Sequence, residues 1–281
     1  MMSICSKYHL CSLLCIVLLV LISPKVGAWE YHSYGCTTEQ IVQMRVSADF
    51  SKSWKNGLSL SFSEDVRVDM YNQLSGMNAK EESVDAVNGP SFNKSYTTLA
   101  LAYSPIKYLK LDVGYTLRLL GGKDWTDYNE YLRHRPHIGL TGIYDTHYVK
   151  LSLRERLLCD IRTDSVNLLE KQQYEWLLRS RLAAEFYVPG KPVKPYAWIE
   201  LENTLNATEY QQKDGHQYIS QVRTQAGVKW RLTRKSSLDF YYRFQYGYNR
   251  DINITKRKEH IQLTEETSYL HAIGVAYNLD W

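Results

Sequence analysis

The stretch SYLHAIGVAYNLDW, residues 268–281, decides the fold of this chain. Counting back from the carboxy terminus, every second residue is apolar, and those between are small or polar: the apolar positions are Trp281, Leu279, Tyr277, Val275 and Ile273. Alternation with a period of two is typical of a β-strand with one apolar face. A free edge strand of this kind invites aggregation. We therefore expect a closed barrel, in which this strand has a neighbour on both sides.

The same alternation recurs along the rest of the chain. Clear segments lie at 42–50, 58–68, 109–119, 174–188, 222–232 and 238–248, and weaker ones near 95–103, 130–143, 147–159 and 194–204. None of them repeats its apolar residues at the spacing of a helix. Apolar residues are thus spread over many strands, as in a membrane barrel, where each strand gives only alternate residues to lipid. The sequence predicts an all-β, antiparallel transmembrane β-barrel.

The connections between these segments predict its topology. Short turns near 51–55, 104–106, 144–146, 189–192 and 233–235 alternate with long polar connections at 70–92, 121–129, 161–172, 205–215 and 251–267. This asymmetry is typical of outer-membrane barrels, which have short periplasmic turns and long outer loops. The segments number eleven, whereas single-chain bacterial barrels have even numbers of strands. We therefore expect about 12 strands, with Trp29–Thr38 as a candidate for the twelfth, or 10 if one segment is split.

The amino-terminal residues predict export. Residues 1–28 combine Lys7, an apolar run over 13–22 and small residues at 26–28, as a signal peptide does. The mature chain would then be a single barrel domain, residues 29–281. It would keep two cysteines, Cys36 and Cys159, whose pairing stays open. Losing Lys7 and Lys25 lowers the formal net charge from +4 to +2, so we expect no nucleic-acid binding.

Several strand segments resemble an uncharacterised outer-membrane family of the Bacteroidetes, the domain-of-unknown-function family 2490. The strings that carry the resemblance are NGLSLSFSEDVRVD (56–69), YLKLDVGYTLR (108–118), RHRPHIGLTG (133–142), LRSRLAAEFY (178–187), KPYAWIELENTL (194–205) and SSLDFYYRFQYGYN (236–249). The resemblance implies a β-barrel in the outer membrane of a Gram-negative bacterium, in contact with outer-membrane lipid. It implies no catalytic residues.

The final strand is also similar to the last strand of bacterial outer-membrane barrels. In those proteins the alternating apolar residues and the terminal aromatic are the signal that the barrel-assembly machinery reads. The resemblance gives this role to Ile273, Val275, Tyr277, Leu279 and Trp281. The machinery would then be a partner during biogenesis, after the signal peptide has been cleaved.

Charged residues on the polar faces of the strands would point into the lumen. The candidates are Asp65, Arg67, Asp112, Arg118, Arg154, Arg156, Glu175, Arg179, Arg181, Glu185, Glu200, Glu202, Arg223 and Arg243. Two interpretations remain open. The charges could form a salt-bridge network that stabilises a closed structural barrel. Alternatively, they could line a pore or binding barrel for small polar solutes, in which the excess of arginine favours anions.

A third hypothesis is a lipid-modifying barrel enzyme. Its candidate residue is His271, which shares the phase of Ile273 and lies about ten residues from the carboxy terminus. A histidine at that depth is also an ordinary interfacial residue, with an apolar ring and a polar edge. No histidine or cysteine spacing fits a metal site, and no glycine-rich loop has the context of a phosphate site. We expect no cofactor, no metal and no enzymatic activity.

Overall fold

The computed structural model describes residues 33–121, 132–163, 167–212, 219–254 and 261–281. Within these ranges the chain forms twelve strands: β1 (Ser33–Ser53), β2 (Leu58–Met77), β3 (Ser83–Asn88), β4 (Ser91–Ile106), β5 (Leu109–Leu120), β6 (Leu132–Asp145), β7 (Val149–Arg162), β8 (Tyr174–Phe186), β9 (Val193–Thr204), β10 (Ile219–Arg231), β11 (Ser236–Ile254) and β12 (Ile261–Asp280). No helix in these ranges is long and apolar enough to cross a membrane.

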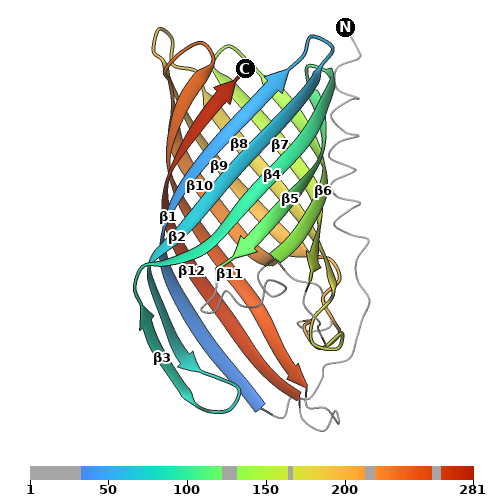
Figure 1. Cartoon of the computed structure of the whole chain (residues 1–281), viewed down its shortest axis with the longest axis vertical. Coiled ribbons are helices and arrows are strands. Elements are labelled where there is room, and N and C mark those ends of the chain that lie inside the picture. The colour runs from blue at the N-terminus through green and yellow to red at the C-terminus, as the bar shows by residue number, and fades with distance from the viewer. Residues whose placement is uncertain (1–32, 122–131, 164–166, 213–218, 255–260) are drawn as a thin grey trace, which may run out of the picture.

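The strands close into a barrel (Figure 1). Successive strands pair antiparallel from β4 round to β12, β2 pairs with β4, and β1 pairs with both β2 and β12. The terminal strand β12 therefore has β11 on one side and β1 on the other. Beyond its end, the Trp281 amide donates a hydrogen bond to the carbonyl oxygen of Ser51 at 2.9 Å. The prediction of an all-β barrel that leaves the last strand no free edge is confirmed.

The barrel wall has eleven strands, not twelve. The twelfth strand in the described part of the chain is β3, which pairs only with β2 and lies outside the ring. The segment proposed as an extra strand, 29–38, does not form one: residues 33–38 extend β1, and residues 29–32 lie outside the described ranges, as does the expected signal peptide. Because strands alternate in direction around an odd-numbered ring, the first and last must run parallel. β1 and β12 do so over 19 residue pairs, from Ser33↔Gln262 to Ser51↔Asp280.

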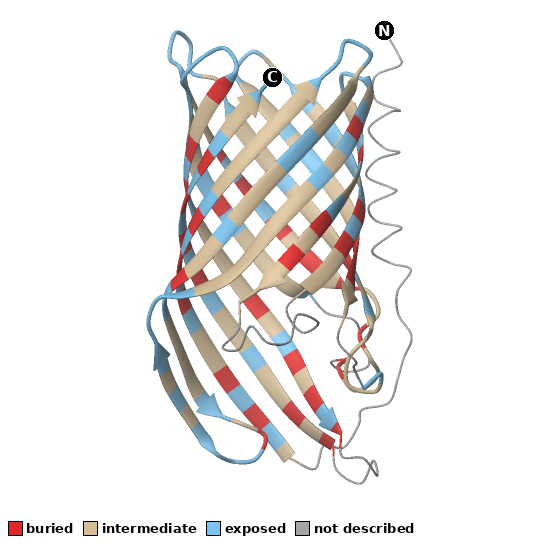
Figure 2. Ribbon diagram, viewed as in Figure 1, coloured by how far each residue is buried: buried red, intermediate tan, exposed pale blue. Residues whose placement is uncertain are grey.

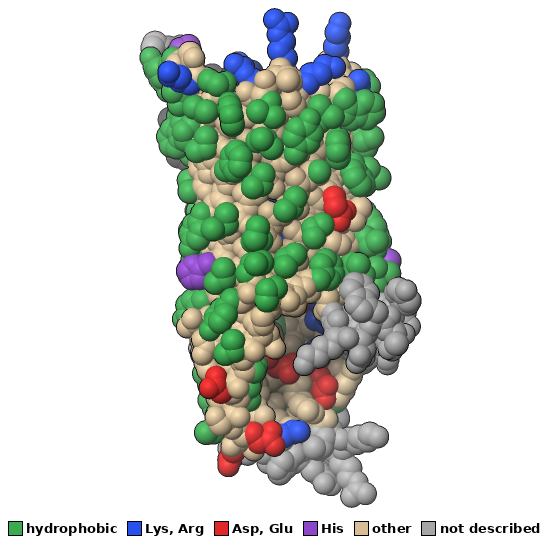
Figure 3. Space-filling view, turned by 60° about the vertical axis from the view of Figure 1, so that its left-hand side comes forward, with side chains coloured by type: hydrophobic (Ala, Val, Ile, Leu, Met, Phe, Trp, Pro, Cys, Tyr) green, Lys and Arg blue, Asp and Glu red, His purple; other side chains and the backbone are tan. Residues whose placement is uncertain are grey.

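The two faces of the wall carry different side chains. Buried and exposed positions alternate over parts of the strands, most clearly on β1 and β12 (Figure 2). On β1, Val42, Met44 and Val46 are exposed, whereas Gln43 and Arg45 between them are buried inside the barrel. Hydrophobic side chains cover the outer wall, and lysine and arginine side chains gather at the end with the short turns (Figure 3). Most of the charged residues on the wall strands thus point inward.

Four strands continue past the rim on the side of the long connections. β1, β2, β11 and β12 have 19 to 21 residues, against 12 to 14 for β5 to β10, and with β3 they form a projecting sheet (Figure 1). The expected loops at 70–92 and 251–267 are therefore wrong over much of their length. Apolar packing stabilises the longer strands. Isoleucines of β11 and β12, together with Leu263, pack against Leu169 and Tyr210 of neighbouring connections. An ion pair between Lys171 and Asp251, 2.8 Å, adds to this contact.

The inner face of β12 carries only small residues between Leu270 and Asn278. The inward residues there are Ala272, Gly274 and Ala276, and the ring of Tyr241 on β11 lies over Gly274 in the space where a side chain would stand. Tyr241 also packs with Ala276, Tyr196 and Trp198 in a small apolar cluster inside the wall. The small residues of this part of the terminal strand therefore make room for the aromatic ring of Tyr241.

Cysteine cross-linking tests the parallel closure. Val46 on β1 and Val275 on β12 are partners in the register, and both side chains point outward. Directly opposed residues in a sheet lie within the Cα–Cα range of disulfides. In a background with Cys36→Ala and Cys159→Ala, we expect Val46→Cys with Val275→Cys to oxidise to an intramolecular disulfide, measured as loss of thiol labelling in the folded protein.

The matched control moves one cysteine by two residues along the same face. Val46→Cys with Ile273→Cys separates the Cα atoms by roughly 8 Å, beyond disulfide reach. This pair should keep its free thiols. Preferential cross-linking of the Ile273 variant would show that the register of β1 on β12 differs from the one described.

Candidate functional site

The lumen is built from alternate residues on adjacent strands. Arg179 and Arg181 are two apart on β8, so both point inward, and the antiparallel register places them opposite Glu202 and Glu200 of β9. On the other side of β9, Arg223 of β10 is also the register partner of Glu200. Sequence alternation and strand register together thus bring these opposite charges into contact.

Glu200 is the most connected carboxylate of the lumen. It is 1% exposed and accepts hydrogen bonds from Arg154 at 3.2 Å, Arg181 at 2.7 Å and Arg223 at 2.7 Å. Its neighbour Glu202 accepts from Arg223 at 3.0 Å and from Arg179. Each acid is therefore surrounded by more guanidinium groups than it can neutralise.

A second group of ion pairs lies on β5, β6 and β7. Asp160, which is 2% exposed, accepts hydrogen bonds from Arg118 and from Arg135, the latter at 2.7 Å. Asp112 on β5 accepts from Arg156 on β7 at 2.9 Å. The contacts of Arg118 with Asp160 and of Arg156 with Asp112 reach over β6, and Arg135 joins β6 itself to β7, so three neighbouring strands of the wall are tied together.

The remaining candidates make more local contacts. Arg67 pairs with Asp65 on its own strand at 2.6 Å, and Glu175 lies 3.6 Å from Arg162. Glu185 pairs with two lysines, Lys229 at 3.0 Å and Lys194 at 3.4 Å. Arg243 has no carboxylate partner in the described structure; its Nε donates to Gln225 at 2.8 Å. All fourteen candidates thus lie on strands of the wall and make polar contacts there.

The ion pairs follow the wall and do not cross the lumen. Each lumenal ion pair in the described part of the barrel joins groups on one strand or on strands no more than two positions apart around the ring. Stacking on aromatic rings also keeps guanidinium groups at the wall. The guanidinium carbon of Arg181 lies 4.0 Å from the centre of the Trp198 ring, and that of Arg67 lies 4.0 Å from the centre of the Tyr96 ring. The side chains of the described residues thus leave space at the centre of the barrel.

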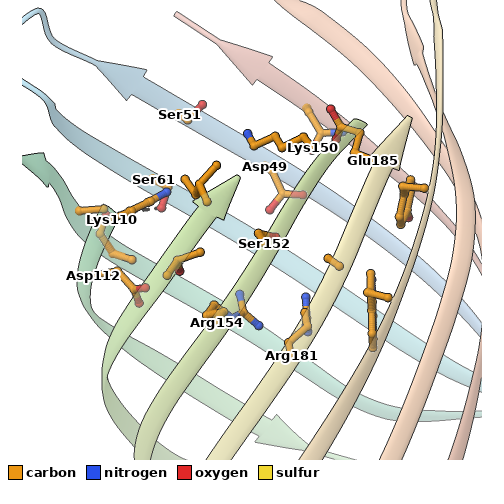
Figure 4. A pocket seen from close by; sticks show the side chains of 18 of the residues that line it. Asp49, Ser51, Ser61, Lys110, Asp112, Lys150, Ser152, Arg154, Arg181 and Glu185 are labelled. Atoms are coloured by element: carbon orange, nitrogen blue, oxygen red, sulfur yellow. Dashed lines mark hydrogen bonds between the residues drawn. The ribbon is translucent and has the colours of Figure 1, made fainter. Parts of the chain in front are cut away.

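Two adjoining cavities occupy this space. The larger, about 720 Å³, lies toward the end with the short turns, and its wall includes Asp49 of β1 and Arg154 of β7 (Figure 4). The smaller, about 390 Å³, shares Arg154, Arg181 and Arg243 with it. Seven lysines or arginines and four carboxylates line the larger cavity, and eight arginines and five carboxylates line the smaller. Both cavities therefore carry an excess of positive charge.

Some lumenal charges were missing from the sequence-based set. Asp160 was missed because the expected strand ended at residue 159, whereas β7 continues to Arg162. Arg45 is 2% exposed, and its Nε donates to Gln43 at 2.6 Å. Further lumenal charges of the larger cavity are Asp49, Lys110, Lys150, Lys229 and Asp239. The sequence does contain a signal for these residues, because each lies on the polar face of its strand in the alternating pattern.

His271 lies on the outer face of β12. Its Nδ1 is 2.6 Å from the hydroxyl of Tyr242, and its ring packs against Phe244. Ser268, the nearest serine in the sequence, is an odd number of residues away and points to the other face, where it lies beside Gly247. A second pair of the same kind, Tyr115 with His134, also lies on the outer face of the barrel.

Two other sequence features can be placed. Cys36 is exposed and Cys159 is buried, and both thiols are free, so the two cysteines do not pair. Within the described ranges, no group of three or more histidine, cysteine, aspartate or glutamate side chains could hold a metal ion.

Comparison with known proteins gives one family and one distant structure. The family model described as "Protein of unknown function (DUF2490)" matches residues 42–255. No curated protein sequence matches the chain. A solved structure, described as "NanC porin structure in rhombohedral crystal form", aligns with 84% of this chain and 99% of its own at 11% identity, with a TM-score of 0.41.

The Glu200 cluster predicts a stability effect. Glu200→Gln keeps the size of the side chain but leaves the guanidinium groups of Arg154, Arg181 and Arg223 without their common counter-charge. We expect a loss of about 3 kcal/mol in the free energy of unfolding, the lower end of the range for breaking a buried ion pair, because the arginines remain partly solvated. Urea unfolding in detergent micelles, followed by tryptophan fluorescence, measures it.

Asp49→Asn is the matched control. It makes the same chemical change at a lumenal carboxylate that has no ion pair or hydrogen bond in the described structure. Its cost should stay below about 1 kcal/mol. Equal losses for the two variants would show that the Glu200 ion pairs do not contribute to stability.

Proposed function

Since the chain belongs to the DUF2490 family, whose function is unknown, we propose a function from the lumen: the protein is a bacterial outer-membrane barrel that passes or binds small polar solutes and favours anions. The observation that carries the proposal is the arrangement of the ion pairs. They keep the charged side chains on the wall, so that cavities with excess positive charge remain along the lumen.

The outer surface supports a membrane location. On β12 the outward residues from Tyr269 to Trp281 include Ile273, Val275 and Tyr277, all exposed. At about 3.3 Å per residue and a tilt near 45°, this stretch is roughly 28 Å tall, close to the apolar band of about 25 Å on outer-membrane barrels. Exposed apolar side chains over the whole height of a wall are unfavourable in water and favourable in lipid.

The rest of the proposal follows from this location. The partners are outer-membrane lipid and, during biogenesis, the barrel-assembly machinery, which would read the terminal strand after removal of residues 1–28. The proposal contains no catalytic step. His271 and Tyr242 form an outward pair of polar-edged rings, a combination suited to the boundary between lipid and water.

Conductance is the direct test. We expect the refolded full-length protein to give discrete current steps in a planar lipid bilayer, with a reversal potential under a salt gradient that indicates anion preference. A heat-modifiable, correctly folded protein that gives no steps would contradict passage through the lumen. It would favour a closed barrel stabilised by the ion pairs described above.

Arg243→Glu tests the origin of the anion preference. Arg243 lines both cavities and has no carboxylate partner in the described structure, so its replacement breaks no ion pair. A unit charge about 10 Å from a passing ion contributes roughly 0.6 kcal/mol at an effective dielectric constant of 20 with one Debye length of screening. Replacing +1 by −1 shifts the energy of an anion and of a cation by about 1.2 kcal/mol each, in opposite directions, so the anion-to-cation permeability ratio should fall by at least about tenfold.

The control for this variant is Arg234→Glu. Residue 234 lies in the exposed turn between β10 and β11, outside the lumen, and the change in net charge is the same. Its permeability ratio should match that of the unmodified protein. Equal effects of the two variants would show that overall charge, and not the lumen, sets the preference.

A further inference from the structure

The larger cavity contains charges that the wall does not neutralise. Lys110 and Lys150 have no ion pair or hydrogen bond from their side chains in the described structure, and neither has Asp49. Asp239 accepts a hydrogen bond from the hydroxyl of Tyr196 at 2.8 Å but has no cationic partner there. All four side chains line the same cavity, and Figure 4 shows three of them, Asp49, Lys110 and Lys150, around it.

Most other charges of this cavity are paired with one another or with Glu200. Arg156 pairs with Asp112, Lys229 pairs with Glu185, and both Arg154 and Arg181 pair with Glu200. Arg243 is the exception; it has no carboxylate partner there, donates to Gln225 and lies over the Trp198 ring. Apart from Arg243, the charged side chains of the larger cavity that have no ionic partner in the described structure are two lysines and two aspartates.

These lysines and aspartates stand on opposite walls. Counting around the eleven-strand ring, β1 with Asp49 and β7 with Lys150 are five strands apart, which is the largest separation the ring allows. The same separation holds between β11 with Asp239 and β5 with Lys110. Of these four groups, the two aspartates thus lie on one side of the cavity and the two lysines on the facing side, so their electric field runs across the lumen.

We propose that the larger cavity binds a zwitterionic solute that carries a carboxylate and an ammonium group, as amino acids and short peptides do. The carboxylate faces Lys110 and Lys150, and the ammonium group faces Asp49 and Asp239. This inference rests on the proposed function, because the solute must enter the lumen. A cavity of about 720 Å³ lies within the usual range for small-molecule sites.

A solute with only one kind of charge would bind weakly in this cavity. An anion is attracted by the two lysines but repelled by the aspartates on the other side. A cation is attracted by the aspartates but repelled by the lysines. A solute with both charges interacts favourably with both walls, and its dipole aligns with the field across the lumen. The anion preference for simple ions comes from the arginines of both cavities and does not conflict with this site.

The experiment compares three probes that differ in charge. In planar bilayers, we would titrate glycylglycine, a zwitterion, against N-acetylglycine, which has only the carboxylate, and glycinamide, which has only the ammonium group. We expect glycylglycine to reduce the salt current at a concentration at least about tenfold lower than the other two, about 1.4 kcal/mol in affinity. Equal blocking by the three probes would overturn the proposal.

Two double variants assign the walls. Asp49→Asn with Asp239→Asn should remove the advantage of glycylglycine over N-acetylglycine and leave the weak block by N-acetylglycine in place. Lys110→Gln with Lys150→Gln should weaken the block by both. Neither variant removes a lumenal ion pair of the described structure, and heat modifiability checks that each still folds. Retention of the full glycylglycine advantage in the aspartate variant, or an unweakened block by both probes in the lysine variant, would contradict the assignment.

The failures of the two proposals can be told apart. Binding of glycylglycine to the protein in detergent micelles, measured by titration calorimetry, does not require conduction. A protein without current steps that still binds glycylglycine, and loses this binding with Asp49→Asn and Asp239→Asn, would overturn passage and support the site. A conducting, anion-selective protein that shows no preference for glycylglycine would overturn the site and leave the proposed function standing.

Discussion

The structure depends on closure of the hydrogen-bonded ring between the first and last strands. In lipid, an unpaired backbone N–H or C=O group costs several kcal/mol, so a sheet can span a membrane only if its two edges meet. Here they meet through β1 and β12, which pair over 19 residues. With eleven alternating strands, this pairing must be parallel. Parallel bonds are slanted and slightly weaker per residue, and the length of the two strands, 21 and 20 residues, offsets this.

Ring size then decides what the charged side chains can do. Eight strands give an interior that side chains fill, and sixteen give an open aqueous channel. In a ring of eleven, an arginine reaches a carboxylate one or two strands away but leaves the centre open, as Arg118 with Asp160 and Arg154 with Glu200 show. The small inward residues of β12 let the Tyr241 ring of β11 lie over Gly274. Width and charge placement are consequences of the same closure.

Local pattern and long-range pairing differ in how far the sequence predicts them. A period of two is a local property, so alternation predicted the strands, the closed barrel and the inward side of residues such as Arg181 and Glu200. The number of strands is harder to predict from the sequence. Eleven segments alternate, but bacterial barrels of one chain usually have an even number of strands. No local pattern indicates that β1 lies parallel to β12. The sequence predicts a loop at the projecting ends of β11 and β12, because polar residues surround Ile252 and Ile254 there. The residues that bury these isoleucines, Leu169 and Tyr210, come from distant segments of the chain. Partners such as Asp160 for Arg135 likewise required the register.

The excess of arginine over carboxylate has a physical consequence for a lumen of this width. An isolated arginine in the lumen would sample many rotamers, and those that extend toward the centre would narrow the lumen. Holding its side chain in one rotamer costs conformational entropy. A carboxylate shared by three arginines, as Glu200 is, holds each guanidinium group against the wall and cancels only part of their charge. Stacking of Arg181 on Trp198 acts in the same direction. The acids therefore position positive charge more than they neutralise it. This arrangement, with fixed groups at the wall and free space between them in the described barrel, is the basis of the proposed passage of solutes.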